Sequence, residues 1–381
     1  MTKLVNFMKV SKYVNCCSFI PSRSIHITQV SHLYTPAALG IDGYLQSRDK
    51  LKEQFSNFTD TFRSKMKEFV FDSKNMVFTE DLKNMVFMAE PVDLELVLNM
   101  IKKYNNQNTK FRFGSYILGP VVMRMFHFLN APKEALQCFE DPANNGFFDQ
   151  LTSYQILLDL LYNHAMYEEM YRVFEKVQEK QLNMSKFPKY PVVLVLAACY
   201  KQNTPKSMEY ASKLWSEMIS VGTVPLRRAS TLFAALALNQ GAPHVALECI
   251  SMQKQNYVTV RNIKAIALAE MGRIDDSLLV LKKVLEVEYT DVAKQTFFEE
   301  TISKVRSAVE KTDSKYVQEL DDIEKLLRER DLVNNENLDK FVCSDIAIVN
   351  KTSQNPQPRG AKQNWSSRGD NNRQINRRHM S

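Results

Sequence analysis

"TSYQILLDLLYNHAMYEEMYRVFEKVQEKQLNMSKFPKYPVVLVLAACYKQN", residues 152–203, shows a helix-like pattern that begins twice. After Tyr154, apolar residues recur at helical spacing, a short polar break follows, and a second helix-like stretch comes next. The same pattern begins again at Tyr190, 36 residues further on. A pattern of this kind that restarts indicates a repeat of helical hairpins.

Similar hairpins can be traced on both sides of this stretch. With Tyr116, Tyr154, Tyr190, Ser230 and Arg261 taken as equivalent, the spacings are 38, 36, 40 and 31 residues, which lie in the range typical of helical solenoids. The first helix of each unit is apolar nearly all round, as in "VVLVLAAC", whereas the second is amphipathic. One hairpin cannot bury such a surface, but a stack of hairpins can. The sequence therefore predicts an all-α protein, an α-solenoid of stacked helix-turn-helix repeats.

The composition agrees with helices and divides the chain into parts. The chain has only 10 glycines and 13 prolines, which is few for the many turns of an all-β protein. No apolar run reaches the roughly 18 residues of a membrane-spanning helix, so we predict no membrane span. The expected parts are a mitochondrial transit peptide (1–30), an N-terminal helical segment (44–78), a solenoid of six hairpins (79–290), C-terminal helices (291–345) and a disordered basic tail (350–381).

The net charge of +7 is concentrated at the two ends of the chain. Residues 1–40 carry +4 without any acidic residue, and residues 351–381 carry +6, which leaves −3 on residues 41–350. The first segment is basic, rich in hydroxyl groups and able to form an amphipathic helix, as in mitochondrial transit peptides. We therefore expect a protein of the mitochondrial matrix; the alternative is a disordered N-terminus with accidental charge.

The C-terminal tail combines arginines with one tryptophan. Arginines interleaved with an aromatic residue suit single-stranded RNA, because they neutralise phosphates while the ring stacks on a base. The alternatives are a solubilising tail or an arm that binds a protein. The candidate RNA-binding residues of the tail are Arg359, Trp365, Arg368, Arg377 and Arg378.

The sequence gives no sign of a catalytic or metal centre. The six cysteines form no CxxC pair and no zinc-like spacing with histidine. Cys138, Cys199 and Cys249 fall inside apolar helical patterns and are expected to be buried thiols. The adjacent acidic pairs are explained by helix starts and charged helix faces. We therefore predict a protein without enzymatic activity, metal or cofactor.

The repeats resemble pentatricopeptide repeats. The first helix follows the pattern T-x-Y-x-x-L-L, and the second carries a glutamate, a phenylalanine and a later apolar residue before a closing proline. The related tetratricopeptide repeats use a Trp-Leu-Gly-Tyr signature that is absent here. The stretches "YILGPVVMRMF", "GFFDQLTSYQILLDLLY" and "RRASTLFAALALNQG" are similar to animal mitochondrial members of this family. The matching positions of single repeats are Thr152, Tyr154, Leu157, Leu158, Glu169, Phe174, Val177, Met218, Gly222 and Pro225.

The resemblance implies a role in mitochondrial RNA maturation and respiratory-chain expression. In such a stack each repeat reads one base with two or three side chains. Gln155, Thr231 and Asn262 stand at the principal reading positions and can hydrogen-bond a base edge. The other principal positions hold Ile117 and Pro191, which cannot. The partner positions hold Lys186, Leu226 and Tyr257 in place of the usual Asp or Asn.

Arg227 and Arg228 lie at the start of a first helix. Arginines in this position can bind phosphate with two hydrogen bonds, although the alternative is a solvated helix start. Two classes of function stay open. One is a solenoid that binds single-stranded mitochondrial RNA and works with RNA-processing enzymes or the mitoribosome. The other is a protein-binding adaptor, mitoribosome-associated or a respiratory-chain assembly factor, which the −3 charge of the body and the incomplete base code favour.

Overall fold

The computed structural model describes residues 33–72, 74–107, 116–254, 257–287, 294–311 and 314–346. All of them belong to one compact unit. The predicted transit peptide and the predicted basic tail, with its five candidate residues, lie outside the described residues.

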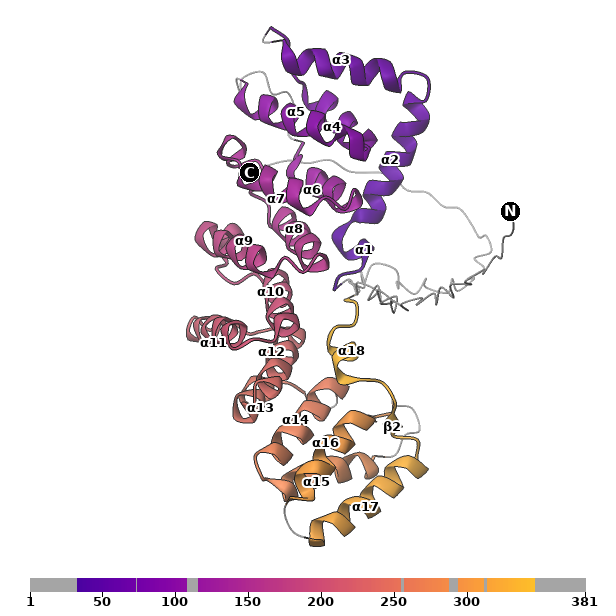
Figure 1. The fold of residues 1–381 in the computed structure, drawn as a ribbon, viewed down its shortest axis with the longest axis vertical. Helices are drawn as coiled ribbons and strands as arrows, with labels where there is room; N and C mark the ends of the chain where they lie inside the picture. The colour runs from indigo at the N-terminus through magenta and orange to yellow at the C-terminus, as the bar shows by residue number, and fades with distance from the viewer. Residues whose placement is uncertain are drawn as a thin grey trace, which may run out of the picture. The chain divides into compact units, whose positions relative to one another are not determined.

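Eighteen α-helices make up most of the described part of the chain (Figure 1). Short 3-10 helices follow or precede some of them, at Pro91–Asp93, Pro142–Asn144 and Leu182–Met184. The α-helices are α1 (Pro36–Leu39), α2 (Ile41–Phe55), α3 (Thr59–Phe71), α4 (Thr79–Met88), α5 (Leu94–Asn106), α6 (Gly119–Phe128), α7 (Pro132–Glu140), α8 (Leu151–Asn163), α9 (Tyr167–Lys180), α10 (Lys189–Gln202), α11 (Pro205–Ser220), α12 (Arg227–Asn239), α13 (Pro243–Ile250), α14 (Val258–Glu270), α15 (Ile274–Leu285), α16 (Glu299–Val309), α17 (Ser314–Glu329) and α18 (Leu338–Val342).

Consecutive helices pair as hairpins, and the hairpins stack. The first helices α4, α6, α8, α10, α12 and α14 form a row in which each contacts the next, and α2 and α16 extend the row at its two ends. Within the row, α8 packs on α9, α12 on α13, and α14 on α15. The predicted all-α solenoid of stacked helix-turn-helix repeats is therefore confirmed.

The row of first helices holds the core because its members are apolar on every side. In α10, all residues from Pro191 to Tyr200 are buried, because the helix lies between α8 and α12 and also packs on α9 and α11. The amphipathic α9 buries only Met170, Tyr171, Val173, Phe174 and Val177 and presents its charged residues to solvent. Cys138, Cys199 and Cys249 are buried free thiols, as predicted.

Two very short strands, β1 (Phe297–Phe298) and β2 (Val333–Asn334), were not predicted from the sequence. They pair in parallel. β1 is attached to α14 by Asn262, whose Oδ1 accepts a hydrogen bond from the backbone N–H of Phe298 at 2.9 Å. This contact brings the segment after α15 back onto the row of first helices.

Candidate nucleic-acid interface

Two segments from opposite ends of the described chain cover part of the row of first helices. The first is the strap, defined here as Asn337–Ile346, which contains α18. α18 packs on α12 and α14, and Leu338, Val342 and Cys343 of the strap are buried. Because these contacts cross more than one repeat, the strap lies along the row and not against a single hairpin.

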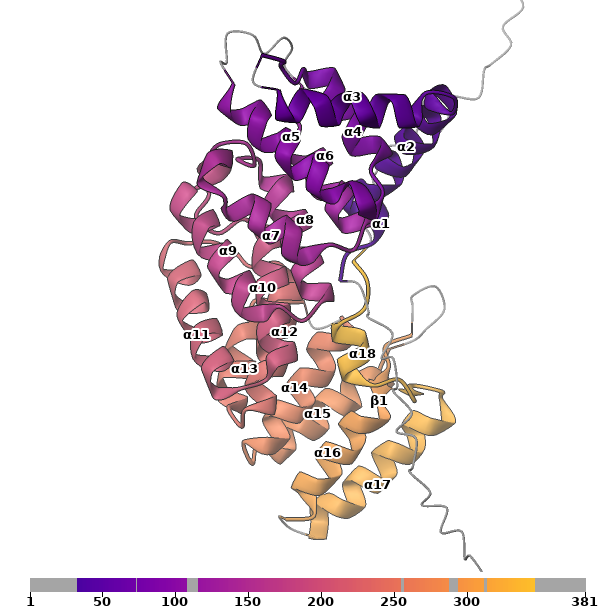
Figure 2. The same ribbon diagram turned by 45° about the horizontal axis from the view of Figure 1, so that its top comes forward.

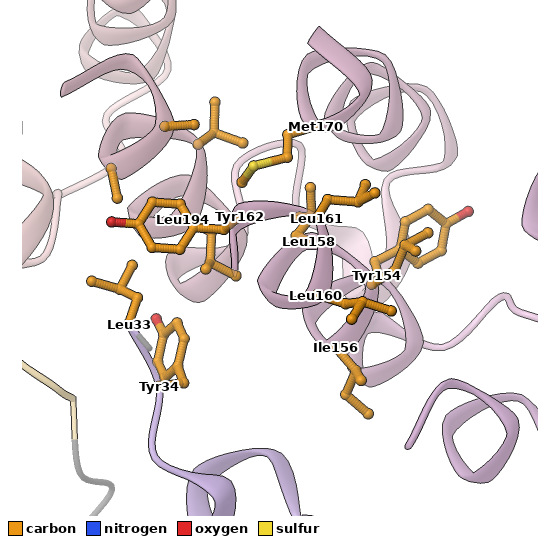
Figure 3. Close-up of a cluster of buried hydrophobic side chains, with 14 of the residues drawn as sticks. Leu33, Tyr34, Tyr154, Ile156, Leu158, Leu160, Leu161, Tyr162, Met170 and Leu194 are labelled. Carbon is orange, nitrogen blue, oxygen red and sulfur yellow. The ribbon is translucent and has the colours of Figure 1, made fainter. Parts of the chain in front are cut away.

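The second covering segment, residues 33–35, pairs with the end of the strap. The backbone N–H of Ile346 donates to the carbonyl of Leu33 at 2.8 Å, and that of Thr35 donates to the carbonyl of Ile346 at 3.3 Å. Leu33 and Tyr34 enter a cluster of buried side chains that also contains Tyr162 and Leu194 (Figure 3). Together, the two segments cover first helices from α8 to α14.

Arg228, a predicted phosphate ligand, is bound to the strap. Its guanidinium donates to the carbonyls of Phe341 and Val342, each at 2.9 Å. It also donates to the carbonyl and the hydroxyl of Ser344, at 2.6 and 3.0 Å. Burial, followed by repulsion from Arg227, lowers the pKa of Arg228. In this arrangement Arg228 caps the carbonyl end of α18, and its role toward phosphate stays a prediction.

Thr231 and Asn262, two predicted base readers, are buried at 1% and 0% exposure. The hydroxyl of Thr231 donates to the carbonyl of Arg228 within its own helix at 3.1 Å. The Nδ2 of Asn262 donates to the carbonyl of Val258 at 2.8 Å, and its Oδ1 holds β1. The third reader, Gln155, is half-buried in α8. Base reading by these residues stays a prediction.

The structure brings Arg227 together with Tyr257, a residue at a predicted partner position. The Arg227 guanidinium carbon lies 4.1 Å from the centre of the Tyr257 ring. Arg227 is exposed at the first position of α12, and Tyr257, 39% exposed, directly precedes α14. An exposed guanidinium stacked on an exposed ring offers both a charge for phosphate and a surface for a base.

Two further exposed residues lie at the start of the first helix one repeat earlier, where the ring of Tyr34 packs edge-on against that of Tyr190, with 6.1 Å between the ring centres. Lys189 and Tyr190 begin α10 and are both exposed. Because α10, α12 and α14 are alternate helices of a stack of hairpins, they run in the same direction and begin on the same side. Their free N–H groups add positive potential there. We call Lys189, Tyr190, Arg227 and Tyr257 the amino-terminal edge.

Sequence reasoning selected one member of this edge and missed the others. Tyr257 was considered only as an atypical base reader, and Lys189 and Tyr190 were not considered as ligands. A usable signal was present, because "KY" at 189–190 and "RR" at 227–228 both open a first helix. The stacking of Arg227 on Tyr257 depends on the rotamers of two residues in different repeats, which spacing alone does not predict.

The described part of the chain holds no group of three or more His, Cys, Asp or Glu side chains that could bind a metal ion. None of the described helices is long and apolar enough to cross a membrane. A hydrogen bond of 3.0 Å joins His127 Nε2 of α6 to Asp159 Oδ2 of α8. Asp159 is fully buried and also accepts a hydrogen bond from Asn163, so this pair lies within the core between neighbouring repeats.

The relatives found by comparison with known proteins all carry the same name. No protein-family model matches the chain. The chain is similar to "Pentatricopeptide repeat-containing protein 2, mitochondrial" of Homo sapiens, with 29% identity over 252 residues, 66% of this chain and 64% of the human protein. The Mus musculus protein of that name is 28% identical over 254 residues, 66% and 65% of the two chains. The Danio rerio protein is 30% identical over 217 residues, 56% of each chain.

These matches confirm the predicted resemblance to pentatricopeptide repeat proteins. The match spans slightly less than two thirds of the human relative's length. The relatives are named as mitochondrial proteins, which supports a mitochondrial location for this chain.

Proposed function

We propose that this protein is a non-catalytic solenoid of the mitochondrial matrix that binds single-stranded mitochondrial RNA. In this role it supports the maturation or stability of a transcript, and so respiratory-chain expression, together with RNA-processing enzymes or the mitoribosome. The observation that carries the proposal is the exposed Arg227–Tyr257 stack on a chain similar to pentatricopeptide repeat proteins. This stack offers two of the contacts that single-stranded RNA requires.

The amino-terminal edge supplies the first contacts in this proposal. Lys189 and Arg227 bind phosphates, while Tyr190 and Tyr257 offer rings on which bases stack. The tail residues Arg359, Trp365, Arg368, Arg377 and Arg378 add further phosphate contacts and one more stacking ring. Base readout by Gln155, Thr231 and Asn262, and phosphate binding by Arg228, belong to a second step, in which the strap and β1 leave the row of first helices.

The test measures binding of a fluorescein-labelled RNA of about 12 nucleotides by anisotropy at about 50 mM salt. Tyr257→Ala lowers the affinity about 5- to 150-fold, since stacking contributes about 1–3 kcal/mol per base, whereas Tyr257→Phe retains it. Arg227→Ala weakens every RNA alike, because phosphate contacts carry no sequence information. The matched controls are Phe71→Ala and Arg172→Ala, which remove an exposed aromatic and an exposed arginine from other helices.

The salt dependence of RNA affinity distinguishes the contribution of the tail from that of the amino-terminal edge. If the tail neutralises about four phosphates, the slope of log affinity against log salt is about −3, at about −0.7 per contact on a single strand. Deletion of residues 351–381 then flattens this slope for every RNA. If the deletion abolishes all binding, the edge is not an RNA site. If the full-length chain binds no RNA at about 50 mM salt, RNA binding is refuted.

A protein-binding adaptor is the second candidate function. It is favoured by the covering of first helices by the strap and residues 33–35, because this part of the row is not free for RNA. The net charge of −3 on residues 41–350 also disfavours broad electrostatic attraction to RNA.

A further inference from the structure

A hollow opens beside α13, the shortest of the second helices of the six hairpins. These second helices are α5, α7, α9, α11, α13 and α15. α13 has 8 residues, compared with 16 in α11 and 12 in α15. α13 and α15 both pack on α14 (Figure 2). Between them lies a cavity of about 450 Å³, with Val260, Lys264 and Leu268 of α14 among its lining residues. The hollow is formed by α13, α14 and α15 and contains no member of the amino-terminal edge.

The hollow carries an excess of positive charge. Lys264, Arg273 and Lys283 line it, and the only carboxylate in the lining, that of Asp276, binds Arg273 at 2.6 Å. Among the described residues, Lys264 and Lys283 have no ion-pair partner. Burial, followed by repulsion from Lys283 and Arg273, lowers the pKa of Lys264. A lining charge of +2 on a body of net negative charge predicts an anionic partner.

The rest of the lining is aliphatic. Leu247, Ile250 and Val280 border the hollow, and Leu279, 47% exposed, continues the apolar surface out of it. No aromatic side chain lines it, so it offers no ring on which a base of single-stranded RNA stacks. Aliphatic side chains beside a half-buried lysine, Lys264, and an exposed one, Lys283, instead fit an amphipathic helix that presents both leucine-like and acidic side chains.

We propose that this hollow docks an acidic amphipathic helix of a partner protein. The apolar side chains of that helix pack against Leu247 and Leu279, and its carboxylates bind Lys264 and Lys283. The inference is independent of RNA binding, since the hollow and the amino-terminal edge share no residue.

The probe is a labelled helical peptide of about 16 residues, with leucine at positions i, i+3, i+4 and i+7 and glutamate at the remaining positions. Its affinity for the full chain is measured by anisotropy, beside a peptide in which lysine replaces every glutamate. Lys264→Glu with Lys283→Glu lowers the affinity for the acidic peptide at least about 30-fold. Lys264→Gln with Lys283→Gln lowers it about 5- to 10-fold and keeps the test valid if the charge-reversed chain fails to fold.

The control is Lys213→Glu with Lys325→Glu, which makes the same change in net charge at exposed lysines outside the hollow. If this control loses as much affinity for the acidic peptide as the variant with Lys264→Glu and Lys283→Glu, the proposal is overturned. Binding would then depend only on the overall charge of the protein. The proposal also fails if the native chain binds the lysine peptide as well as the acidic one, or binds neither. If the Lys264 and Lys283 variants weaken RNA binding but not peptide binding, the hollow is a phosphate site and not a docking site for a helix.

Discussion

Replacement of Arg228 by alanine tests whether its guanidinium holds the strap in place. Four hydrogen bonds run from this side chain to Phe341, Val342 and Ser344. The carbonyl of Phe341 also accepts from the backbone N–H and the hydroxyl of Ser344. The variant therefore deprives mainly the carbonyls of Val342 and Ser344 of their donor.

The magnitude follows from these two carbonyls. A buried acceptor left without a donor costs about 1–3 kcal/mol, so the two carbonyls together cost about 2–6 kcal/mol. Partial access of water to the strap keeps this sum near its lower end. We expect opening of the strap to become easier by about 2–3 kcal/mol. At a factor of ten per 1.4 kcal/mol, this is about 30- to 150-fold faster hydrogen exchange in residues 337–346.

The measurement is hydrogen exchange followed by mass spectrometry, with a peptide from α5 as the internal reference. Arg227→Ala is the matched control, because Arg227 is the neighbouring arginine and its guanidinium stacks on the ring of Tyr257. Arg228→Lys keeps the positive charge but loses the several N–H donors of the planar guanidinium. We expect its rate of hydrogen exchange in the strap to lie between those of Arg227→Ala and Arg228→Ala. If the strap exchanges at the same rate in Arg228→Ala and Arg227→Ala, the Arg228 hydrogen bonds do not hold the strap in place.

Three further outcomes are expected. Leu196→Asp, at a fully buried position of α10, lowers the free energy of unfolding by more than about 4 kcal/mol in urea titration; a loss below about 1 kcal/mol contradicts the packing of α10. His127→Ala removes one hydrogen-bond partner of the fully buried Asp159 side chain and costs about 1–3 kcal/mol, whereas apolar replacement of both residues costs less; equal costs show that the two residues do not act as a pair. Burial raises the pKa of Cys199 to about 12, so its thiol reacts with iodoacetamide at least about 100-fold more slowly in the native chain than in urea at pH 8; similar rates show that α10 opens.

The stack of hairpins was predictable because its causes are local. Apolar periodicity and polar breaks within about 35 residues identify each hairpin. The continuous apolar run of α10 requires neighbours on both sides, which only a stack provides. Burial of Cys199 follows from the same pattern.

The strap was not predictable because its contacts are remote in sequence. Arg228 and Ser344 are 116 residues apart, and α18 has only five residues, too few to show a helical period. The burial of Thr231 and Asn262 has related causes, since both lie in helices that α18 contacts and Asn262 also holds β1. Repeat spacing predicts which residues share a position, but not what covers that position.

The covering of the row has an energetic consequence for the order of binding events. Displacing the strap removes the Arg228 hydrogen bonds and exposes Leu338 and Val342, at about 1.5–3 kcal/mol for each buried side chain. The strap is also tethered to the row, so it competes at an effective concentration in the millimolar range. Two base contacts, at about 1–3 kcal/mol each, do not exceed this sum. If this protein binds RNA as we propose, we therefore expect the RNA to contact the amino-terminal edge and the basic tail first. It would reach Thr231 and Asn262 only if contacts made elsewhere along the chain offset the loss of the strap.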